Sequence, residues 1–420
     1  MAFCSCAPPV LLIALVACGS SQHAAAGADR YVLTAQRIYT TPEAAPIDNG
    51  WVEVSGGTIV AVGSGAPPEA RHDAACSGGV ITAGFHNSHV HFTAPAFAGA
   101  ARAPAGALEP AIAELTTKWG FTTVTDTASN PGDTMPLRDR ILRGELRGPK
   151  ILTVGAGLYA DIPFYLRDLP PAVLASLPQP KTADEARAVV RAMLALGTDG
   201  TKLFIATPQG HGVIHRMAPE VAAAAVEETH RAGKLVMVHP TDTEGVTAAV
   251  TAGVDIVVHT TIDPDPSIWS PELIAQLVTK HVALVPTLKL WTYELAKRQA
   301  PKDEVDKVEG YALHQLAAFL TAGGRVLFGT DAGYMTDLDP TDEYAWMARA
   351  GMTPMQILAS LTTNPAAEWN ATATRGRVAE KLAADLVVLD GDPATDVKRF
   401  AAVKCTIRAG TPVYRRDAAR

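Results

Sequence analysis

The sequence predicts an α/β fold in which a (β/α)8 TIM barrel carries a small β-sandwich domain built from the N- and C-terminal segments. Two observations lead to this prediction. Between Gly84 and Asn370, short apolar runs alternate with helical stretches, and there are enough runs to close a barrel of eight strands. On both sides of this region, apolar and polar residues alternate as they do in half-buried β-strands.

Residues 1–18 have the features of a bacterial lipoprotein signal peptide. The apolar run Val10–Ala17 is too short to cross a bilayer, and Leu15-Val16-Ala17-Cys18 resembles a lipobox. We expect Cys18 to be lipidated and residues 19–29 to form a flexible tether. The protein would then be exported and anchored at the bacterial cell envelope, facing the periplasm. Because no Lys or Arg precedes the apolar run, a soluble periplasmic or secreted protein stays open, as does a frayed cytosolic N-terminus.

The segments flanking the barrel are expected to pair into the β-sandwich. Residues 30–83 would form its N-terminal part, in which Ser55-Gly56-Gly57 joins two strands. Residues 371–420 would form its C-terminal part. The strand-like stretches there are Gly376–Glu380, Ala384–Pro393 and Val403–Tyr414.

Residues 84–370 are expected to form the barrel. Thr182-Ala183-Asp184-Glu185 is a capping-box pattern that opens a helix running to Ala195. Pro219 opens the next helix, which Gly233 ends. Such alternation implies parallel strands joined by right-handed crossovers. The eight candidate strands are Gly84–Phe92, Thr122–Asp126, Ile151–Leu158, Gly200–Ile205, Leu235–His239, Ile256–Thr260, Val282–Thr287 and Arg325–Thr330.

Composition indicates a globular protein that acts on a small molecule. The chain has 420 residues, of which 48% are hydrophobic and 19% are charged. Its formal net charge is -7 and it has no run of Lys or Arg, which argues against a nucleic-acid partner. We therefore expect a small-molecule substrate. The sequence is compatible with an oligomer but does not indicate the number of subunits.

Two of the five cysteines are expected to lie in the folded part of the protein. If Cys4 and Cys6 are removed with the signal and Cys18 carries lipid, Cys76 and Cys405 remain. Both fall in segments assigned to the β-sandwich, so a disulfide is feasible in an oxidising compartment. We expect two buried, unpaired thiols instead.

The stretch Gly84–Phe92, reading GFHNSHVHF, points to a metal site. His89 and His91 stand two residues apart, after an apolar stretch that reads as a strand. Alternate residues of a strand point to the same side. Both imidazoles can therefore reach one divalent metal. Further candidates stand at the C-terminal ends of later apolar runs, where the catalytic groups of a barrel are found. They are Lys202, His239, His259 and Asp331.

The order of these motifs resembles that of the amidohydrolase superfamily over nearly all of the sequence after the signal. The motifs are Gly84–Phe92, Gly120–Thr127, Leu196–Phe204, His239, His259, Phe328–Gly333, Met352–Ala366 and Ala384–Pro393. Within the superfamily, the chain looks most like the imidazolonepropionase-like and Xaa-Pro dipeptidase-like branch, of the binuclear type with a carboxylated lysine. The resemblance implies the barrel fold and a metal-dependent hydrolytic activity.

The resemblance also implies two divalent metal ions. His89, His91 and Asp331 would hold the more buried ion, and His239 and His259 would hold the second. Zinc suits this set of nitrogen and oxygen ligands best, and manganese, cobalt or iron also fit it.

Lys202 matches the lysine that bridges the metals in the binuclear branch, through the spacing Gly-x-Asp-x-x-Lys at a strand end. An ammonium ion cannot ligate a cation. In that branch the lysine reacts with carbon dioxide to give an anionic carbamate, and this form of Lys202 would bridge the two ions. The alternative is an unmodified surface lysine whose stem lies along the strand end.

The implied mechanism is hydrolysis by a metal-bridging hydroxide. Two cations acidify the water between them and polarise the scissile carbonyl. Asp331 would take the proton during attack and return it to the leaving amine. His259 would ligate and also orient the substrate oxygen.

Other residues near the strand ends receive different expectations. His86 lies three residues before His89, so we expect it outside the metal cluster. His211 and His215 follow the fourth strand and would either reach the substrate or lie in a solvated loop. We expect the aromatic residues Tyr159, Tyr334 and Trp291 to line the pocket. We expect Lys289 and His314 to be structural or exposed.

The leading functional prediction is hydrolysis of a non-peptide carbon–nitrogen bond in a small amide or cyclic amide. Lys202 argues against imidazolonepropionase itself, which uses one metal and lacks the lysine. The alternatives are an Xaa-Pro-type dipeptidase, which needs a positive group for the substrate carboxylate, and a lactonase or esterase on the same site. A function of a different class also stays open, that of a catalytically inactive ligand-binding lipoprotein. It predicts that some of the metal ligands are missing.

Overall fold

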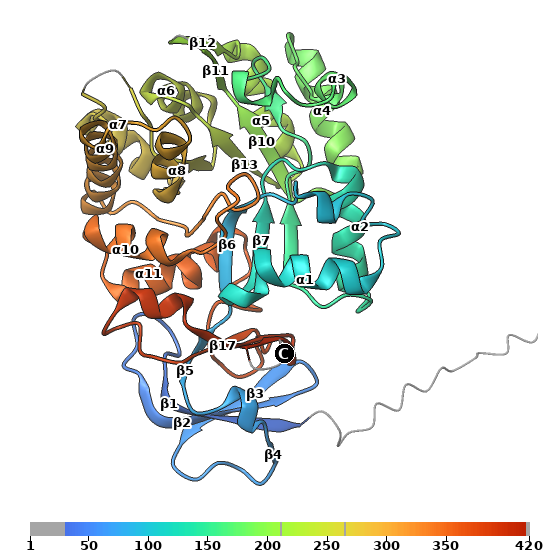
Figure 1. The fold of residues 1–420 in the computed structure, drawn as a ribbon, viewed down its shortest axis with the longest axis vertical. Helices are drawn as coiled ribbons and strands as arrows, with labels where there is room; N and C mark the ends of the chain where they lie inside the picture. The colour runs from blue at the N-terminus through green and yellow to red at the C-terminus, as the bar shows by residue number, and fades with distance from the viewer. Residues whose placement is uncertain (1–29, 211, 264–265, 417–420) are drawn as a thin grey trace, which may run out of the picture.

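The computed structural model describes residues 30–210, 212–263 and 266–416. A barrel region that carries most of the helices sits on a smaller β-domain, in which the first strands of the chain lie beside the last ones (Figure 1). The predicted signal peptide, lipobox and tether fall outside the described residues. So does His211.

One curled sheet forms the β-domain. The strand order is β18-β17-β16-β5-β1-β2-β3, and β4 pairs with β1, so N- and C-terminal strands meet where β16 pairs antiparallel with β5. The strands are β1 (Tyr31–Ile38), β2 (Ile47–Ser55), β3 (Thr58–Ser64), β4 (Arg71–His72), β5 (Val80–Ala83), β16 (Leu386–Leu389), β17 (Val403–Arg408) and β18 (Thr411–Arg415).

The alternation of side chains gives this sheet two apolar faces. Leu33, Ile81 and Leu386 belong to the domain's own core, whereas Val387 and Leu389 join the core of the barrel. The predicted turn is present, because Gly56 and Gly57 adopt φ values of 55° and 81° between β2 and β3. Burial of both faces fixes the domain against the barrel.

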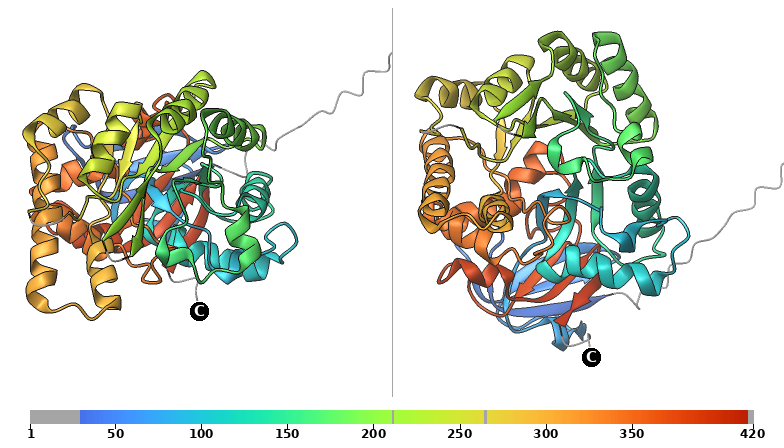
Figure 2. Two further views of the ribbon diagram at one scale, coloured as in Figure 1. Left: turned by 90° about the horizontal axis from the view of Figure 1, so that it is seen from above. Right: turned by 45° about the horizontal axis from the view of Figure 1, so that its top comes forward.

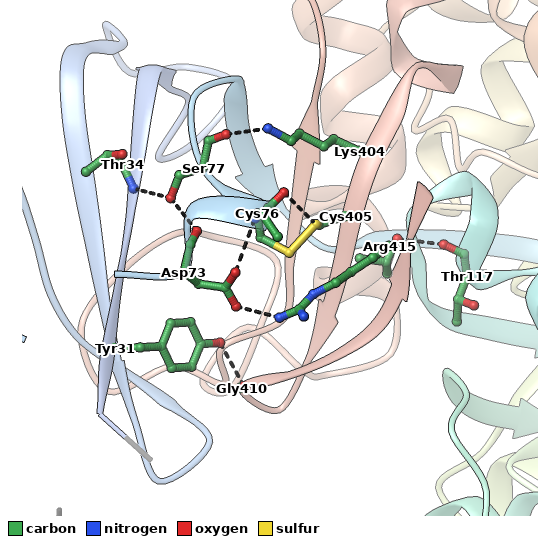
Figure 3. The surroundings of a disulfide bond; sticks show 12 residues. Tyr31, Thr34, Asp73, Cys76, Ser77, Thr117, Lys404, Cys405, Gly410 and Arg415 are labelled. Carbon is green, nitrogen blue, oxygen red and sulfur yellow. Dashed lines mark hydrogen bonds and ion pairs between the residues drawn. A yellow bond between two sulfur atoms is a disulfide. The ribbon is translucent and has the colours of Figure 1, made fainter. Parts of the chain in front are cut away.

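Cys76 and Cys405 form a disulfide, with Cα atoms 5.5 Å apart, so the prediction of two unpaired thiols is wrong (Figure 3). Asp73 caps the 3-10 helix that carries Cys76 and also accepts a hydrogen bond from Arg415 at 2.6 Å. The disulfide holds the helix against β17, and the contact with Arg415 holds it against β18. The pairing therefore depends on tertiary contacts between segments 329 residues apart in sequence.

The barrel strands are parallel and form two hydrogen-bonded groups. The first group has the order β6-β7-β8, and the second has the order β15-β14-β13-β10-β9. Their bounds are β6 (Phe85–Val90), β7 (Phe121–Asp126), β8 (Lys150–Thr153), β9 (Leu158–Tyr159), β10 (Gly200–Phe204), β13 (Leu235–His239), β14 (Ile256–Val258) and β15 (Ala283–Val285). A short hairpin, β11 (Ala206–Gly210) and β12 (Val213–Arg216), follows β10.

Single backbone hydrogen bonds connect the two groups into a ring. The Asp199 amide donates to the Thr153 carbonyl at 2.6 Å, which joins β8 to the start of β10. On the other side, Leu284 of β15 bonds to Arg325 and Leu327, and Ser88 of β6 donates to Phe328 at 2.7 Å. The eighth position of the ring is therefore filled by the stretch that ends in Asp331.

Two predicted strands differ in detail from the structure. The stretch Ile151–Leu158 is interrupted, because Gly155 adopts φ 68° between β8 and β9. The stretch Arg325–Thr330 contains one bridge residue, Val326, which pairs with Leu284. Gly376–Glu380, expected as a strand, lies outside the regular strands described and bonds through Val378 to the carbonyl of Thr40.

The helices lie outside the strands and wrap around them (Figure 2). The predicted boundaries of two helices are confirmed: the Thr182 side chain caps α4, and Pro219 starts α5. The helices are α1 (Ala105–Leu115), α2 (Pro131–Leu142), α3 (Pro171–Ser176), α4 (Ala183–Ala195), α5 (Pro219–Arg231), α6 (Thr243–Ala252), α7 (Pro271–Thr279), α8 (Lys289–Lys297), α9 (Lys302–Thr321), α10 (Thr341–Arg349), α11 (Pro354–Leu361) and α12 (Thr363–Glu368). Among the described residues, none of these helices is long and apolar enough to span a bilayer.

Candidate metal centre and active site

A pocket of about 370 Å³ opens at the carboxyl ends of the barrel strands. All six residues predicted as metal ligands line it, although they come from strands spread over most of the barrel sequence. They are His89, His91, Lys202, His239, His259 and Asp331.

The two histidines of the H-x-H triplet converge on the carboxylate of Asp331. The Nε2 atoms of His89 and His91 lie 3.2 Å apart, and they lie 3.1 Å and 3.0 Å from Oδ1 of Asp331. Within the described part of the chain, this buried oxygen has no hydrogen-bond partner of acceptable geometry. Three lone-pair-bearing atoms therefore meet where a cation could be held.

The glycines of the motif Phe328–Gly333 allow this close approach. A Cβ atom on Gly329 would lie 2.9 Å from the Cβ of His89, and one on Gly333 would lie 1.8 Å from the carbonyl oxygen of His91. Asp331 itself adopts φ 60°, a left-handed conformation that Asp tolerates better than most residues. Larger residues at the two glycine positions would push the eighth segment away from β6.

Asn87, which the sequence analysis missed, fixes the same junction. Its buried side chain accepts hydrogen bonds from the amides of His89, at 3.1 Å, and Thr330, at 3.2 Å. Its Nδ2 donates to the Thr330 hydroxyl at 2.8 Å. No local pattern marks Asn87, because its sequence neighbours His86 and Ser88 are also polar.

His239 and His259 stand on the other side of the pocket. Their ring centroids are 4.8 Å apart, and His259 is 4.9 Å from His89. Nδ1 of His259 hydrogen bonds to the Thr287 hydroxyl at 2.6 Å, which orients the ring and leaves Nε2 free to face the pocket. Both His259 and Thr287 have positive φ values, 74° and 43°, and such strained backbone is concentrated at functional sites.

Burial favours the protonation states that bind metals. It lowers the pKa of His89 and His239 to about 3 and the pKa of His259 well below its usual value, with the positive charge of Lys202 adding to the effect for all three. Burial opposes ionisation of Asp331, but the imidazoles of His89 and His91 outweigh it and hold the pKa of that carboxyl well below its usual range. The site thus presents neutral imidazoles and a carboxylate.

Lys202 is buried among these groups, with 1% of its surface exposed. Among the described residues, its ammonium group makes no hydrogen bond or ion pair and lies 5.2 Å from the Phe204 ring centroid. Burial lowers the pKa of Lys202 to about 7, so a large share of the side chain is the neutral amine near neutral pH. The structure thus rules out the alternative of a surface lysine.

Aromatic side chains form much of the pocket wall. Tyr159, Trp291 and Tyr334 line it, as predicted. Tyr159 stacks on Phe204 with ring centroids 4.2 Å apart, and Trp291 donates to the Thr260 hydroxyl at 2.7 Å. The wall residues that sequence reasoning missed include Phe164, Tyr165, Leu290, Glu294, Leu295 and Arg298.

Several of these missed residues belong to α8, whose position depends on a buried carboxylate. Glu343 of α10 accepts hydrogen bonds from the amides of Leu288, at 2.9 Å, and Lys289, at 2.8 Å. It therefore caps the start of α8 from a distant helix. Such long-range capping leaves no local sequence signal.

The other candidates lie away from the metal cluster. His86 bonds to the Thr125 hydroxyl at 2.9 Å and lines a different cavity, at the opposite end of the barrel. His215, on the hairpin, pairs with Asp161 at 2.7 Å and does not line this pocket. Lys289 is buried and bonds to the Asp339 carbonyl, and His314 is exposed on α9, so both expectations are confirmed.

Comparisons with known proteins agree with this geometry. An uncharacterized protein of Mycobacterium tuberculosis is 29% identical over 187 residues, which are 41% of this chain and 46% of that protein. The match therefore spans less than half of the relative's length. Two solved structures share the fold over 92% of this chain. They are a Xaa-Pro dipeptidase with methionine in its active site (TM-score 0.77, 21% identity, 100% of that chain) and the ochratoxinase of A. niger (TM-score 0.74, 20% identity, 96% of that chain).

A sequence model of the amidohydrolase family matches residues 80–413. This range runs from β5 to β18 and includes the whole barrel and every residue that meets in the pocket. Because the match covers most of the chain, this protein belongs to the amidohydrolase family.

Proposed function

We propose that this protein is a metal-dependent hydrolase that cleaves a carbon–nitrogen bond of a small amide. The observation that carries the proposal is the convergence of His89, His91 and Asp331 within about 3 Å of one another beside the buried Lys202. A buried cluster of neutral imidazoles around a carboxylate suits a divalent cation.

We propose that the pocket holds two metal ions. His89, His91 and Asp331 would hold one, and His239 and His259 would hold the other. Zinc is the metal that we propose, with manganese, cobalt and iron as substitutes. When bound, the ions would acidify a water molecule and polarise the substrate carbonyl.

Lys202 would join the two metal sites as a carbamate. The neutral amine attacks carbon dioxide, a nitrogen–carbon bond forms, and one proton leaves to solvent. The product is an anion with two oxygens. Burial of an unpaired ammonium costs free energy, and conversion to an anion among bound cations removes that cost.

Asp331 would move the proton during hydrolysis. Its carboxylate would accept a proton from the attacking water and deliver it to the amine as the carbon–nitrogen bond breaks. His259 lies across the pocket with its ring held by Thr287, so it is placed to orient the substrate carbonyl oxygen.

The pocket wall favours substrates with an apolar or aromatic group. Tyr159, Phe204, Trp291 and Tyr334 offer flat surfaces around a volume of about 370 Å³, which is small enough for one compact ligand. We therefore propose a small amide or cyclic amide in which such a group adjoins the scissile bond.

A second candidate is an Xaa-Pro-type dipeptidase, which is favoured by Arg298. Arg298 lines the pocket, and its guanidinium could donate hydrogen bonds to a substrate carboxylate. It is already bonded to Glu304, with Nη1 to Oε2 at 3.1 Å, so the substrate would have to compete with that pair. A lactonase or esterase would need no such cation.

We further propose that the protein is exported and attached to the cell envelope through lipidated Cys18. The lipobox-like stretch Leu15–Cys18 supports this proposal. The disulfide between Cys76 and Cys405 adds support, because disulfides persist in oxidising compartments.

The test is a substrate screen on chain lacking Met1–Cys18. Aryl amides, cyclic amides, Xaa-Pro dipeptides and lactones are assayed before and after chelation, and after zinc, manganese or cobalt is restored. We expect turnover of amides that chelation abolishes and metal restores. If the protein prefers the dipeptides and the Arg298→Ala variant loses the dipeptidase activity, the second candidate is the correct one. Turnover that survives complete metal removal would refute the proposal.

A further inference from the structure

A second cavity, of about 290 Å³, lies at the amino-terminal end of the barrel strands, opposite the catalytic pocket. Lys150 at the start of β8 and Lys234, just before β13, line one side of it. Trp369 and Arg375, which follow α12, and Asp385, which precedes β16, line the other side. We call this space the basal cavity.

Acidic residues in the wall are already engaged. Asp199 pairs with Arg138 at 3.3 Å, and its side chain also accepts from the Thr153 amide. Glu368 pairs with Arg325 at 2.8 Å. Each of these two carboxylates has a cationic partner outside the cavity, although the charge of Asp199 also acts favourably on Lys150.

Asp385 instead pairs with a cation of the cavity wall itself. Its Oδ2 lies 3.1 Å from Nη1 of Arg375, and its Oδ1 accepts from the Ala409 amide at 2.8 Å. In the described part of the chain, Lys150 and Lys234 have neither an ion pair nor a hydrogen bond from their ammonium groups. The basal cavity therefore contains two ammonium groups that have no direct ion-pair partner among the described residues.

Two buried N–H donors around the cavity also lack acceptors. Nη1 of Arg375 bonds to the Thr123 hydroxyl at 3.2 Å, but its Nε has no partner within the described ranges, and neither does Nε1 of Trp369. Buried donors are rarely left unpaired, because each one costs free energy of desolvation.

The electrostatic environment disfavours the charged form of Lys150. Burial lowers the pKa of Lys150 and the charge of Arg375 adds to the effect, whereas the charges of Asp199 and Asp385 oppose it. Burial and then the charges of Arg375 and Lys150 also lower the pKa of His86, to about 3, so this wall residue stays neutral. An anion in the cavity would relieve each of these costs.

We propose that the basal cavity binds a small oxyanion, a compound that bears a carboxylate or phosphate group. The ammonium groups of Lys150 and Lys234 supply the charge. The unpaired Nε of Arg375 and Nε1 of Trp369 supply directed hydrogen bonds. The volume exceeds that of one inorganic ion, so a compact organic acid or monophosphate fits. The site is independent of the catalytic pocket and of the function proposed for it.

The test uses calorimetric titration of the chain lacking Met1–Cys18 with inorganic phosphate and, separately, with citrate, at constant ionic strength. We expect saturable binding of at least one of them. Lys150→Met should weaken it by about tenfold or more, because a charge-assisted hydrogen bond is lost. Lys398→Met is the matched control, since this lysine is exposed and does not line the cavity. The stronger ligand tells whether the site prefers phosphate or carboxylate.

Two further measurements test the same site independently of Lys150. Trp369→Phe keeps an aromatic side chain, although a smaller one, and removes the Nε1 donor, so it should weaken binding several-fold even if Lys150→Met fails to fold. Crystals soaked in selenate should give an anomalous peak in the basal cavity. Absence of saturable binding, binding that both cavity variants leave unchanged, or a peak only at the catalytic pocket would overturn the proposal.

Discussion

Nε2 of His91 lies 3.0 Å from Oδ1 of Asp331, so the first and eighth positions of the barrel meet at one point. The backbone reinforces this junction, because the His91 amide donates to the Ala332 carbonyl at 2.8 Å. A cation held there would be fixed by both ends of the barrel sequence. The same contact places the carboxylate beside the space where a substrate carbonyl would lie.

Replacing Asp331 by Asn should abolish most of the hydrolytic activity. The amide cannot accept and return a proton, so we expect kcat to fall by about a hundredfold or more. The variant is assayed alongside its metal content, so that loss of metal is separated from loss of the base. Asp161→Asn, which changes an aspartate outside the pocket, should retain activity. Full activity of Asp331→Asn with metal bound would show that another group moves the proton.

Replacing Lys202 by Ala should remove about one of two metal ions per chain. Without the side chain no carbamate can bridge the sites, and the ligands that remain beside His239 and His259 are too few. Elemental analysis gives the metal content, and short carboxylic acids such as acetate should restore part of the activity. Lys118→Ala, which removes an exposed lysine paired with Glu114, is the control. Normal metal content in Lys202→Ala would rule out the carbamate bridge.

Reducing the disulfide should lower the stability of the protein. The bond closes a loop between residues 329 apart, so its loss should cost about 2–5 kcal/mol of unfolding free energy. Chemical denaturation is followed with and without dithiothreitol. The double variant Cys76→Ser, Cys405→Ser should resemble the reduced protein and should not respond to the reductant. If the wild type does not respond either, the two thiols are unpaired in solution.

The buried Glu343 should make stability depend on pH. Burial raises the pKa of Glu343 from 4.5 to about 7 in the folded state, so the folded protein binds this proton more tightly than the unfolded chain. Its contribution to stability is therefore fully present below pH 4.5 and is lost as the pH rises to about 7.

Unfolding free energies of wild type and Glu343→Gln, measured from pH 4.5 to 8, test this dependence. The difference between wild type and variant should shift against the wild type by up to roughly 3 kcal/mol as the pH rises. Glu69→Gln, at an exposed position, should show no such trend. A difference that stays constant with pH would mean that Glu343 is ionised throughout, as its two backbone hydrogen bonds would favour.

The sequence identified the parts of this site that depend on local patterns. His89 and His91 could be paired because strand residues alternate, and Asp331 could be placed because a glycine-rich stretch follows an apolar run. The helix bounds at Thr182 and Pro219 are likewise local, since capping depends on residues within one turn.

Features that join distant segments could not be predicted in this way. The disulfide depends on how β17 lies against the helix that holds Cys76, and the wall residues Glu294 and Arg298 depend on how Glu343 anchors α8. The third predicted strand is interrupted at Gly155, and the eighth contains a single bridge at Val326. Hydrophobic periodicity predicts neither the interruption of the third strand nor the single bridge of the eighth.

Metal content per chain tests the central claim most directly. Protein lacking Met1–Cys18 is purified without chelator and measured by elemental mass spectrometry. About two divalent ions per chain is the result that the account predicts. About one ion would contradict the bridging role of Lys202. No ion, even after incubation with zinc, would contradict the hydrolase itself and favour an inactive ligand-binding protein.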